Sequence, residues 1–500
     1  MIRKVLVLSG GTAGYLCAVG LKARMPGLDV KLIRLRDSEP GFNQASSLPL
    51  TRFLHGFLPL ELRKFIEMAR PVWTLGHKMI WGPRDHYFHP YTTQLDLRNP
   101  NLPRNNAFYV GDDIDDAGAL TAMMAQDKVF YRMQNGQPAW AWDVGYQLDD
   151  ALLVHCLNTL ANAIGVETID GSLVEAKQDA SGITGITLDS GVTEVADLYV
   201  DASEARSLLL GGALKEPFVS FKSSLPCDRI VAGGWSRTIE PMHGYSTCET
   251  MDAGWCWQLE LQERIERGYV FSSAHLSDAQ AESEFRTKNP NIAETRFISF
   301  KSGRYERGWV KNVVAVGAAE GFVEPLQSTF LGVVAARCQL LAEILVEGGR
   351  VVAPAHVKLY NRHHSRIWDS IRKLLALHYK YNTRLDTPFW LAARKDVELT
   401  GAETIVEYYR QCGPSSLWSP MVIDPVDLFG MGGYLMALIG MKVPTRLAYP
   451  IPQLEKSVWD ADRQRARGAA ASGLSVAEAL SRLPIGQPQS ERTPLAGQVG

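Results

Sequence analysis

The sequence of 500 residues lacks several features that would each define a class of protein. It has no excess of one charge, because 52 basic residues face 54 acidic ones, and this argues against a nucleic-acid or anionic-membrane partner. Its seven cysteines contain no CxxC pair, which argues against a zinc site and against a disulfide framework. No uninterrupted run reaches ~18 apolar residues. We therefore expect no metal site and no membrane-spanning helix.

The N-terminal residues lead directly into an apolar strand pattern, so we expect no signal peptide. Scattered, unpaired cysteines favour a reducing compartment, and we expect a cytoplasmic protein. A composition of 46% hydrophobic and 21% charged residues is typical of a large globular enzyme. The length predicts ~2–3 folding units.

The N-terminal segment has the pattern of a strand (4–8), a glycine-rich turn (9–14), a helix (15–25) and a second strand (29–33). Such a βαβ unit binds a dinucleotide, since its glycines let the backbone approach a pyrophosphate and its helix N-terminus offers free N–H groups. Ser9 replaces the first glycine of the usual pattern, and Arg34 stands where an acidic partner of the ribose is common. The sequence therefore predicts an α/β fold with a variant nucleotide-binding opening.

The rest of the chain divides into segments of different character. Residues 47–143 are rich in proline, histidine and aromatics and predict inserted helices and loops. A helix (149–163) and short strands follow, with a β-rich part at 215–300, a strand at 312–317 and a long apolar helix at 332–345. We divide the chain into a βαβ opening (1–46), a cap or substrate insertion (47–145), the completion of the nucleotide domain (146–345), a helical C-terminal cap (346–485) and a disordered tail (486–500).

Two short runs are the most informative part of the chain. Trp255 and Trp257 lie two positions apart on a predicted strand, so their indoles point the same way and can wall off a cavity. The run 322–329 follows the strand at 312–317 and places hydroxyls and backbone N–H groups beside it. Together these runs indicate a flavoenzyme whose substrate is kept away from its flavin.

At this point the motifs resemble those of the flavin-dependent tryptophan halogenases, over nearly the full length. The segments that carry the resemblance are Gly-Gly-Thr-Ala-Gly (10–14), Tyr-Phe-His-Pro (87–90), Asp-Leu-Tyr-Val-Asp-Ala-Ser (197–203), Gly-Trp-Cys-Trp (254–257), Gly-Tyr-Val-Phe-Ser-Ser (268–273), Trp-Val-Lys-Asn (309–312), Gly-Phe-Val-Glu-Pro-Leu (321–326) and Asp-Thr-Pro-Phe-Trp (386–390). The resemblance implies an FAD-binding domain of the glutathione-reductase or monooxygenase type with inserted β-rich segments, and a mainly helical substrate cap.

The resemblance also implies a reaction. In the family, reduced FAD from a separate flavin reductase, O2 and a halide ion yield hypohalous acid, which passes down a tunnel beside two tryptophans. A lysine then positions or carries the halogen, and a glutamate stabilises the cationic ring of a small aromatic substrate. The expected cofactor is thus FAD and the expected partners are a flavin reductase, a halide and an aromatic molecule, with a homodimer as an ordinary assembly.

Transferred residue by residue, the resemblance places flavin, halide and tunnel contacts on this chain. The expected flavin contacts are Gly11, Thr12, Ala13, Gly14, Arg34, Ala45, Leu173 and Gly317. The expected halide site is Thr329 and Phe330, through backbone N–H groups, and the expected tunnel and substrate residues are His89, Trp255 and Trp257. Phe330 stands where the family has glycine, and a phenylalanine does not adopt positive φ as readily.

The catalytic residues depart from the family pattern. Thr74 stands at the position of the family lysine and Gln327 at that of the glutamate, while Lys78 occupies the later basic position of the same segment. Lys78 reaches the tunnel only if a short gap is allowed, and otherwise it is a solvated or structural cation. The catalytic candidates are therefore Lys78, Thr74, Gln327 and Ser328.

Three functions remain open at the level of sequence. The first is an FAD-dependent halogenase acting on an indole, phenol or larger aromatic molecule. The second is a flavin-dependent monooxygenase or oxidase on the same scaffold, with Gln327, Ser328 and His77 or His89 orienting the substrate, which accounts for the missing lysine and glutamate. The third is a flavin-binding protein without turnover. Asp201 is expected to cap the turn that follows it through Arg206.

Overall fold

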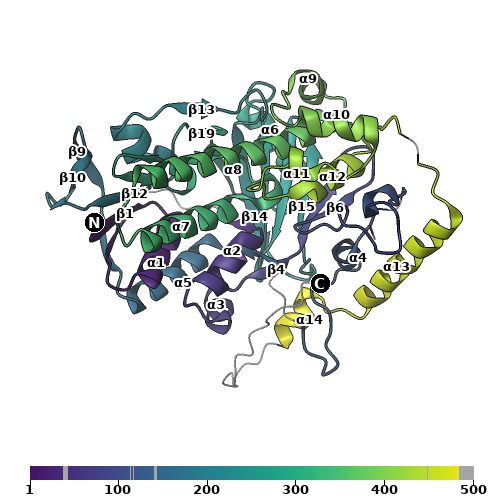
Figure 1. The fold of residues 1–500 in the computed structure, drawn as a ribbon, viewed down its shortest axis with the longest axis horizontal. Helices are drawn as coiled ribbons and strands as arrows, with labels where there is room; N and C mark the ends of the chain where they lie inside the picture. The colour runs from purple at the N-terminus through teal and green to yellow at the C-terminus, as the bar shows by residue number, and fades with distance from the viewer. Residues whose placement is uncertain (38–42, 113, 116, 140–143, 448, 483–500) are drawn as a thin grey trace.

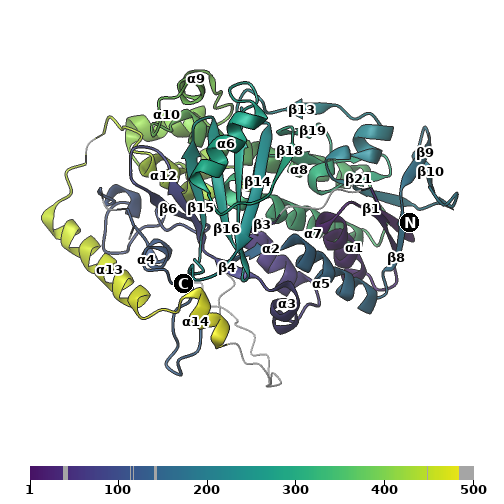
Figure 2. The ribbon, with the colours of Figure 1, turned by 180° about the vertical axis from the view of Figure 1, so that it is seen from behind.

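A computed structural model describes residues 1–37, 43–112, 114–115, 117–139, 144–447 and 449–482 (Figure 1). The predicted tail at 486–500 lies outside the described residues. The hairpin of β9 (Leu173–Asp179) and β10 (Gly182–Leu188) lies at one end of the molecule and helix α13 (Gln453–Ala471) at the other (Figures 1 and 2). Two large sheets lie between these ends.

The first large sheet has six strands and is built around the predicted βαβ unit. In spatial order its strands are β20 (Trp309–Val310), β21 (Val313–Ala315), β12 (Leu198–Ala202), β1 (Lys4–Ser9), β2 (Asp29–Leu35) and β8 (Glu167–Gly171). All neighbouring strands run parallel except β20 and β21, which pair antiparallel. A parallel sheet is covered on both faces, and alternate residues of a strand serve the two faces. Accordingly, Val5 and Val7 join one hydrophobic cluster, and Leu6 and Leu8 another.

Helices cover one face of this sheet and a small sheet covers the other. The covering helices are α1 (Thr12–Arg24), α5 (Asp150–Ala163) and α7 (Phe330–Glu347). The small antiparallel sheet consists of β9, β10 and β11 (Thr193–Glu194) and packs its isoleucines onto Leu6 and Leu8. The predicted helices at 15–25, 149–163 and 332–345 are confirmed within a few residues. This part of the molecule has the expected α/β architecture.

The second large sheet has seven strands. In spatial order they are β18 (Thr295–Ser299), β14 (Arg229–Ser236), β17 (Arg264–Phe271), β16 (Gly254–Glu260), β15 (Ser246–Met251), β5 (Gly76–Ile80) and β6 (Tyr87–Pro90). The prediction of helices and loops alone for 47–143 is therefore wrong. Strands β5 and β6 are short, and they join the sheet because β5 pairs with β15, far away in sequence, while β6 pairs with β5. Local pattern could not reveal the pairing with β15.

Two further three-stranded sheets connect the large ones. One contains β3 (Gln44–Ser46), β7 (Gly145–Leu148) and β4 (Val72–Thr74), and the other contains β13 (Phe218–Ser220), β19 (Gly303–Tyr305) and β22 (Gly321–Phe322). Short helices fill the connections, namely α2 (Leu48–Arg52), α3 (Leu62–Ala69), α4 (Ala119–Ala125) and α6 (Asp278–Lys288), with single π or 3-10 turns at Phe53–Phe57, Asn106–Phe108, Glu204–Arg206, Leu208–Ala213, Gly317–Ala319 and Leu326–Ser328.

The C-terminal part is helical, as predicted. Its helices are α8 (Pro354–Lys380), α9 (Pro388–Asp396), α10 (Glu403–Cys412), α11 (Ser419–Val422), α12 (Gly430–Gly440), α13 and α14 (Val476–Ser481). The long helix α8 runs beside α7 across the molecule (Figure 1). Among the described residues, one segment, Leu326–Glu347, has the length and mean hydropathy, 1.7, of a membrane span, and 61% of it is buried inside the protein. Since α7 packs between α1 and α8, this segment is a core helix.

Candidate functional site

A groove opens at the carboxyl end of β1, where the glycine-rich turn meets α1. It encloses about 710 Å3 and is lined by Gly10 and Gly11 of the turn, Arg34 at the end of β2, and Gly233 and Gly234 of β14. Helix α1 has no acidic residue in its first turn and no side-chain cap, so its N-terminal N–H groups remain available. This end of a helix attracts phosphate groups.

Close packing at the turn depends on two glycines. A Cβ atom on Gly14 would lie 2.3 Å from the Ser9 hydroxyl oxygen, and one on Gly317 would lie 2.7 Å from the Ala13 Cβ atom. Gly317 also has φ +68°, a conformation that favours glycine. The variant residue Ser9 is accommodated because its hydroxyl donates to the Gly11 carbonyl at 2.9 Å. The turn therefore keeps the tight geometry that a dinucleotide requires.

Acidic side chains surround the same groove. The Asp150 carboxylate accepts a hydrogen bond from the Thr12 hydroxyl at 2.7 Å, and burial raises the pKa of Asp150. Burial and the neighbouring Asp150 raise the pKa of Glu204 to about 7. Burial likewise raises the pKa of Glu266, which lines the groove. Burial thus disfavours the charged form of each of these carboxyl groups.

The expected flavin contacts fall into two groups in the structure. Arg34 lines the groove and forms a bidentate pair with Asp170 (2.7 and 2.9 Å), while Thr12, Ala13 and Gly14 open α1 directly behind the turn. Leu173, in contrast, packs in the hydrophobic cluster between the parallel sheet and the β9–β10 hairpin and does not line the groove. Ala45 lies on β3, beside a second, enclosed cavity.

Sequence reasoning missed Gly233 and Gly234. They lie inside strand β14, and a Cβ atom on Gly234 would come within 2.5 Å of the Ile265 carbonyl oxygen. A glycine pair within a strand often marks a close backbone approach, so the run Ala-Gly-Gly-Trp (232–235) carried a usable signal.

The two tryptophans lie on one face of β16, as predicted. Their ring centroids are 6.2 Å apart. The Trp255 indole N–H donates to the buried Glu324 carboxylate at 3.0 Å, whereas the Trp257 Nε1 atom is buried without a hydrogen-bond partner. Trp257 lines the enclosed cavity together with Ala45 and Ser328. Trp257 therefore lines one cavity with residues of β3 and of the turn that precedes α7.

Gly268 on β17 makes room for the Trp257 indole, since a Cβ atom there would lie 2.0 Å from the ring atom Cζ2. We expect Gly268→Ala to displace the indole, to lower stability by about 1–3 kcal/mol through overpacking, and to reduce product formation. Thermal unfolding and product yield measure the two effects. Gly27→Ala is a matched control, because no atom lies within 4 Å of the added Cβ. Equal activity and stability of both variants would contradict this role of Gly268.

Buried histidines gather beside the enclosed cavity. His77 on β5 pairs in register with His89 on β6, and the His89 ring lies 6.2 Å from that of His378 on α8. The Gln327 amide contacts the His378 Nε2 atom at 3.2 Å. Burial, with the neighbouring His89, lowers the pKa of His77 and of His378 to about 3, and burial lowers that of His89 to about 4. All three rings are therefore neutral at pH 7.

The backbone before α7 is strained at two residues. Gln327 has φ 67° and Ser328 φ 52°, in the left-handed region that disfavours side-chain-bearing residues. Phe330 begins α7 with ordinary helical geometry, so positive φ is not required where the family has glycine. Its ring packs on Phe322, with centroids 5.7 Å apart. Strain held by surrounding structure is often associated with function.

The two catalytic candidates on the β4–β5 segment have different surroundings. Thr74 is buried, hydrogen-bonds to the Gly76 backbone, and lies with Ser328 near the Tyr91 hydroxyl. Lys78 follows His77 along the strand and therefore lies on the opposite face. There its charge acts on His243. The structure brings together Thr74, Gln327, Ser328 and His89 and leaves Lys78 outside this group.

Asp201 has a structural role whose partners differ from the expected one. Its carboxylate accepts hydrogen bonds from Ser203 (2.5 Å) and from the backbone of Leu209 and Leu210 (2.7 and 2.8 Å). Arg206 instead forms an ion pair with Asp37 at 2.6 Å. Asp201 therefore caps the turn that follows it, as predicted, but through the Ser203 side chain and the backbone N–H groups of Leu209 and Leu210.

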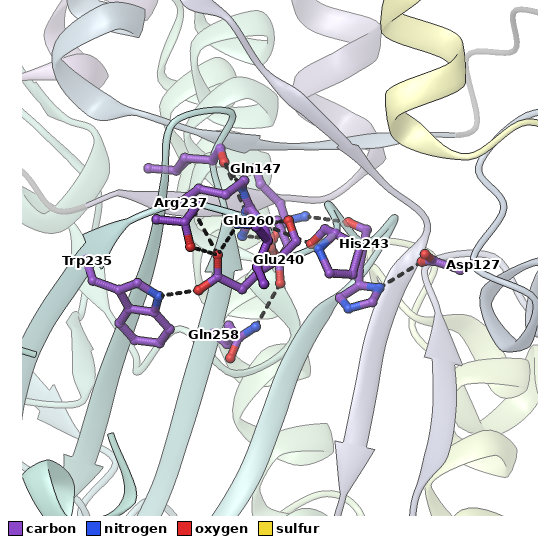
Figure 3. A network of polar contacts seen from close by, with 12 residues as sticks. Asp127, Gln147, Trp235, Arg237, Glu240, His243, Gln258 and Glu260 are labelled. Carbon is purple, nitrogen blue, oxygen red and sulfur yellow. Dashed lines mark hydrogen bonds and ion pairs between the residues drawn. The ribbon is translucent and has the colours of Figure 1, made fainter. Parts of the chain in front are cut away.

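A polar network anchors the segment that carries Ser246, the neighbour of His77 (Figure 3). Glu260 accepts from Arg237 at 2.6 Å, and its backbone N–H donates to Gln147 at 2.8 Å. Gln147 reaches the His243 carbonyl at 3.3 Å, and the His243 ring contacts Asp127 at 2.8 Å. The ends of β7, β14 and β16 are thereby tied to the start of β15.

Comparison with known proteins agrees with this geometry. Residues 4–454 match the family model of the tryptophan halogenases. Tryptophan 6-halogenase ThaL of Streptomyces albogriseolus is 28% identical over 453 residues, which cover 83% of each chain. The crystal structure of MibH, described as a lathipeptide tryptophan 5-halogenase, has 34% identity and a TM-score of 0.88 and covers 96% of this chain and 93% of its own. BrvH, a flavin-dependent halogenase from Brevundimonas sp. BAL3, has 25% identity and a TM-score of 0.84, covering 96% and 99%. The chain therefore belongs to the tryptophan halogenase family and is an oxidoreductase of the flavin-dependent halogenase type.

Proposed function

We propose that this protein is an FAD-dependent halogenase that uses reduced FAD and O2 to halogenate an aromatic substrate of the indole or phenol type. The observation that carries the proposal is the enclosed cavity between Asn43–Ala45 and Ser328, walled by Trp257. An enclosed site keeps a reactive halogen species away from water and from solvent-exposed side chains.

The residues around the groove support FAD as the cofactor. The turn Gly10–Gly14 and the open N-terminus of α1 would hold the pyrophosphate, Arg34 would lie beside the adenosine part, and Ala45 and Gly317 would lie beside the flavin ring. When bound in reduced form, FAD supplies the electrons that activate O2. A separate flavin reductase would deliver it.

The N-terminus of α7 supports a halide site at Thr329 and Phe330. Helix α7 has no acidic residue in its first turn and no side-chain cap, and the Thr329 hydroxyl is buried without a hydrogen-bond partner. Backbone N–H groups at this end of the helix would face an anion favourably. All seven cysteines are free thiols, which supports a reducing, cytoplasmic location.

The relatives indicate the substrate class to examine first. ThaL is named a tryptophan 6-halogenase and MibH a lathipeptide tryptophan 5-halogenase. We extend both possibilities to this chain and propose that its substrate carries an indole, free or within a peptide.

A second candidate function is a flavin-dependent monooxygenase or oxidase on the same scaffold. The observation that favours it is that the buried residues beside the enclosed cavity carry no charge. Thr74 and Gln327 replace the lysine and glutamate of the family, and the three histidines are neutral. A flavin-binding protein without turnover is the remaining alternative.

One experiment separates these functions. Purified protein is incubated with FAD, a flavin reductase and NADH, with free indoles, phenols and tryptophan-containing peptides, in the presence or absence of bromide. Mass spectrometry of a halogenase reaction shows the bromine isotope doublet only with bromide. Oxygen gain or hydrogen loss regardless of bromide would assign the second function, and bound FAD without any product would argue against both.

Restoring the family carboxylate at position 327 directly tests whether Gln327 takes part in halogenation. We expect Gln327→Glu to increase bromination about tenfold, equivalent to ~1.4 kcal/mol, because a carboxylate stabilises a cationic ring intermediate better than an amide. The rate of bromoindole formation measures the effect. Gln339→Glu, on the exposed side of α7 beside Glu343, is the control and should change nothing. A lower rate for Gln327→Glu would contradict this account.

A further inference from the structure

Glu204 has a backbone conformation that glutamate rarely adopts. Its φ is 56°, in the left-handed region that favours glycine. The residue is partly buried and begins the turn Glu204–Arg206, shortly after strand β12. Strained backbone of this kind persists where the surrounding structure holds it, and it is concentrated at ligand sites. A glutamate at this place therefore indicates a role for its carboxyl group.

The carboxyl group of Glu204 lies over the start of helix α1. A Cβ atom on Gly11 would lie 3.3 Å from the Glu204 Oε1 atom. Gly11 is the N-cap residue of α1 and lines the groove at the carboxyl end of β1. The N–H groups at this helix end carry partial positive charge and attract a carboxylate as well as a phosphate. Glu204 thus lies at the same helix end as the proposed site of the pyrophosphate.

A second carboxyl group lies at this end of α1. Asp150, the first residue of α5, accepts a hydrogen bond at 2.7 Å from the hydroxyl of Thr12, the first residue of α1. Burial, together with the negative charge of Asp150, raises the pKa of Glu204 to about 7. Near neutral pH, Glu204 therefore exists in both its protonated and its charged form.

Two further charged groups act on Glu204. Asp201 on β12 raises the pKa of Glu204, and Arg206, which lies in the same turn and pairs with Asp37 at 2.6 Å, lowers it. The first turn of α1 and the turn Gly317–Ala319, which packs against the Glu204 turn, contribute no acidic or basic side chain. These surroundings hold the pKa of Glu204 close to neutral.

We propose that Glu204 sets the affinity for FAD by taking up a proton when the pyrophosphate binds, an inference that rests on the proposed FAD site. The pyrophosphate carries two permanent negative charges, which would lie beside the carboxyl groups of Glu204 and Asp150. Protonation of Glu204 removes one repulsion between like charges, so the protonated protein binds more tightly. The proton comes from the solvent, and no other bond forms or breaks. The cofactor is thereby held less tightly as the pH rises, which suits a cofactor that a separate reductase delivers.

The sign of the pH dependence follows from this proton uptake. Below the pKa of Glu204 in the free protein, about 7, the carboxyl group already holds its proton, and the dissociation constant for FAD does not change with pH. Above this pKa, each binding event takes up a proton, and the dissociation constant rises about tenfold per pH unit. Between pH 6 and pH 8 we therefore expect the wild-type protein to lose about tenfold in affinity.

The test measures FAD binding at pH 6 and pH 8 by isothermal titration calorimetry, without turnover. Titrations in two buffers of different ionisation enthalpy give the number of protons taken up. Glu204→Gln keeps the shape of the side chain and removes its charge. Glu204→Gly also removes the charge and adopts positive φ without strain, so it folds even if the glutamine variant does not. Glu175→Gln, on an exposed residue of β9, is the control.

We expect the wild type and Glu175→Gln to take up about one proton at pH 8 and to bind FAD about tenfold more weakly than at pH 6. Both Glu204 variants should bind at pH 8 as tightly as at pH 6. An unchanged pH dependence in the Glu204 variants, or a wild-type affinity that is equal at pH 6 and pH 8, would overturn the role of Glu204. A wild type that shows this proton uptake but forms no halogenated product would support the role of Glu204 and contradict the proposed function.

Discussion

Arg337→Met is expected to destabilise the protein by about 3–5 kcal/mol. The Arg337 guanidinium on α7 donates to the Glu320 carboxylate at 3.2 Å, and both side chains are fully buried. It also donates to the Tyr360 carbonyl of α8 at 3.2 Å and lies 3.6 Å from the centre of the Tyr360 ring. Removal of the cation would leave the buried Glu320 carboxylate between α7 and α8 with the His364 ring, 3.3 Å away, in place of a permanent positive charge. Urea unfolding measures the loss.

Two controls distinguish the broken pair from lost packing. The double variant Glu320→Gln/Arg337→Met removes both charges, so it should be more stable than Arg337→Met alone. Arg63→Met breaks the exposed pair with Glu67 on α3, which contributes ~0.3–0.5 kcal/mol. Equal losses from the single and double variants would show that the charge pair does not matter.

The pH dependence of stability follows from the same pair. Burial alone would raise the pKa of Glu320, but Arg337 and the His364 ring outweigh burial and hold it below the ordinary value of 4.5. A lowered carboxyl pKa stabilises the folded state above the unfolded pKa, and this contribution is lost as the pH falls below it. Arg337→Met should therefore weaken the acid-side loss of stability.

The N-terminal βαβ part of the fold was predictable because its signals are local. A strand, a glycine turn and a helix follow one another within residues 4–24. The glycine turn named Gly14, whose close approach to Ser9 the structure shows, whereas Gly317 was assigned through the resemblance. Leu173 was transferred by resemblance alone, and the structure gives it a packing role.

The sequence named His77 and His89 individually, but their grouping with His378 was not predictable, since it depends on elements far apart in the chain. His77 faces the cavity because β5 joins β15, about 170 residues later, and a shift of one residue would have placed Lys78 there instead. The positive φ at Gln327 and Ser328 has no local sign either, because neither residue is glycine. These features arise from tertiary packing that overrides local preference.

Gly14→Ala is expected to raise the dissociation constant for FAD about 100-fold, or ~2.7 kcal/mol. The added Cβ would lie 2.3 Å from the Ser9 hydroxyl oxygen and 2.9 Å from the Ser9 Cα atom, so the start of α1 must move away from β1. That shift withdraws the N–H groups that would face the pyrophosphate. Quenching of flavin fluorescence in a titration measures the affinity.

A second variant distinguishes the clash with the Ser9 backbone from the clash with the Ser9 hydroxyl. Ser9→Ala/Gly14→Ala removes the hydroxyl but leaves the Ser9 Cα atom in place, so the double variant should recover only part of the affinity. A ligand present at 100 times its dissociation constant stabilises a protein by ~2.7 kcal/mol. At a fixed FAD concentration, Gly14→Ala should therefore lose most of the stabilisation by FAD that thermal unfolding measures. Gly27→Ala should keep it. An unchanged FAD affinity in folded Gly14→Ala would place the cofactor away from this turn and would contradict the proposed pyrophosphate site at the start of α1.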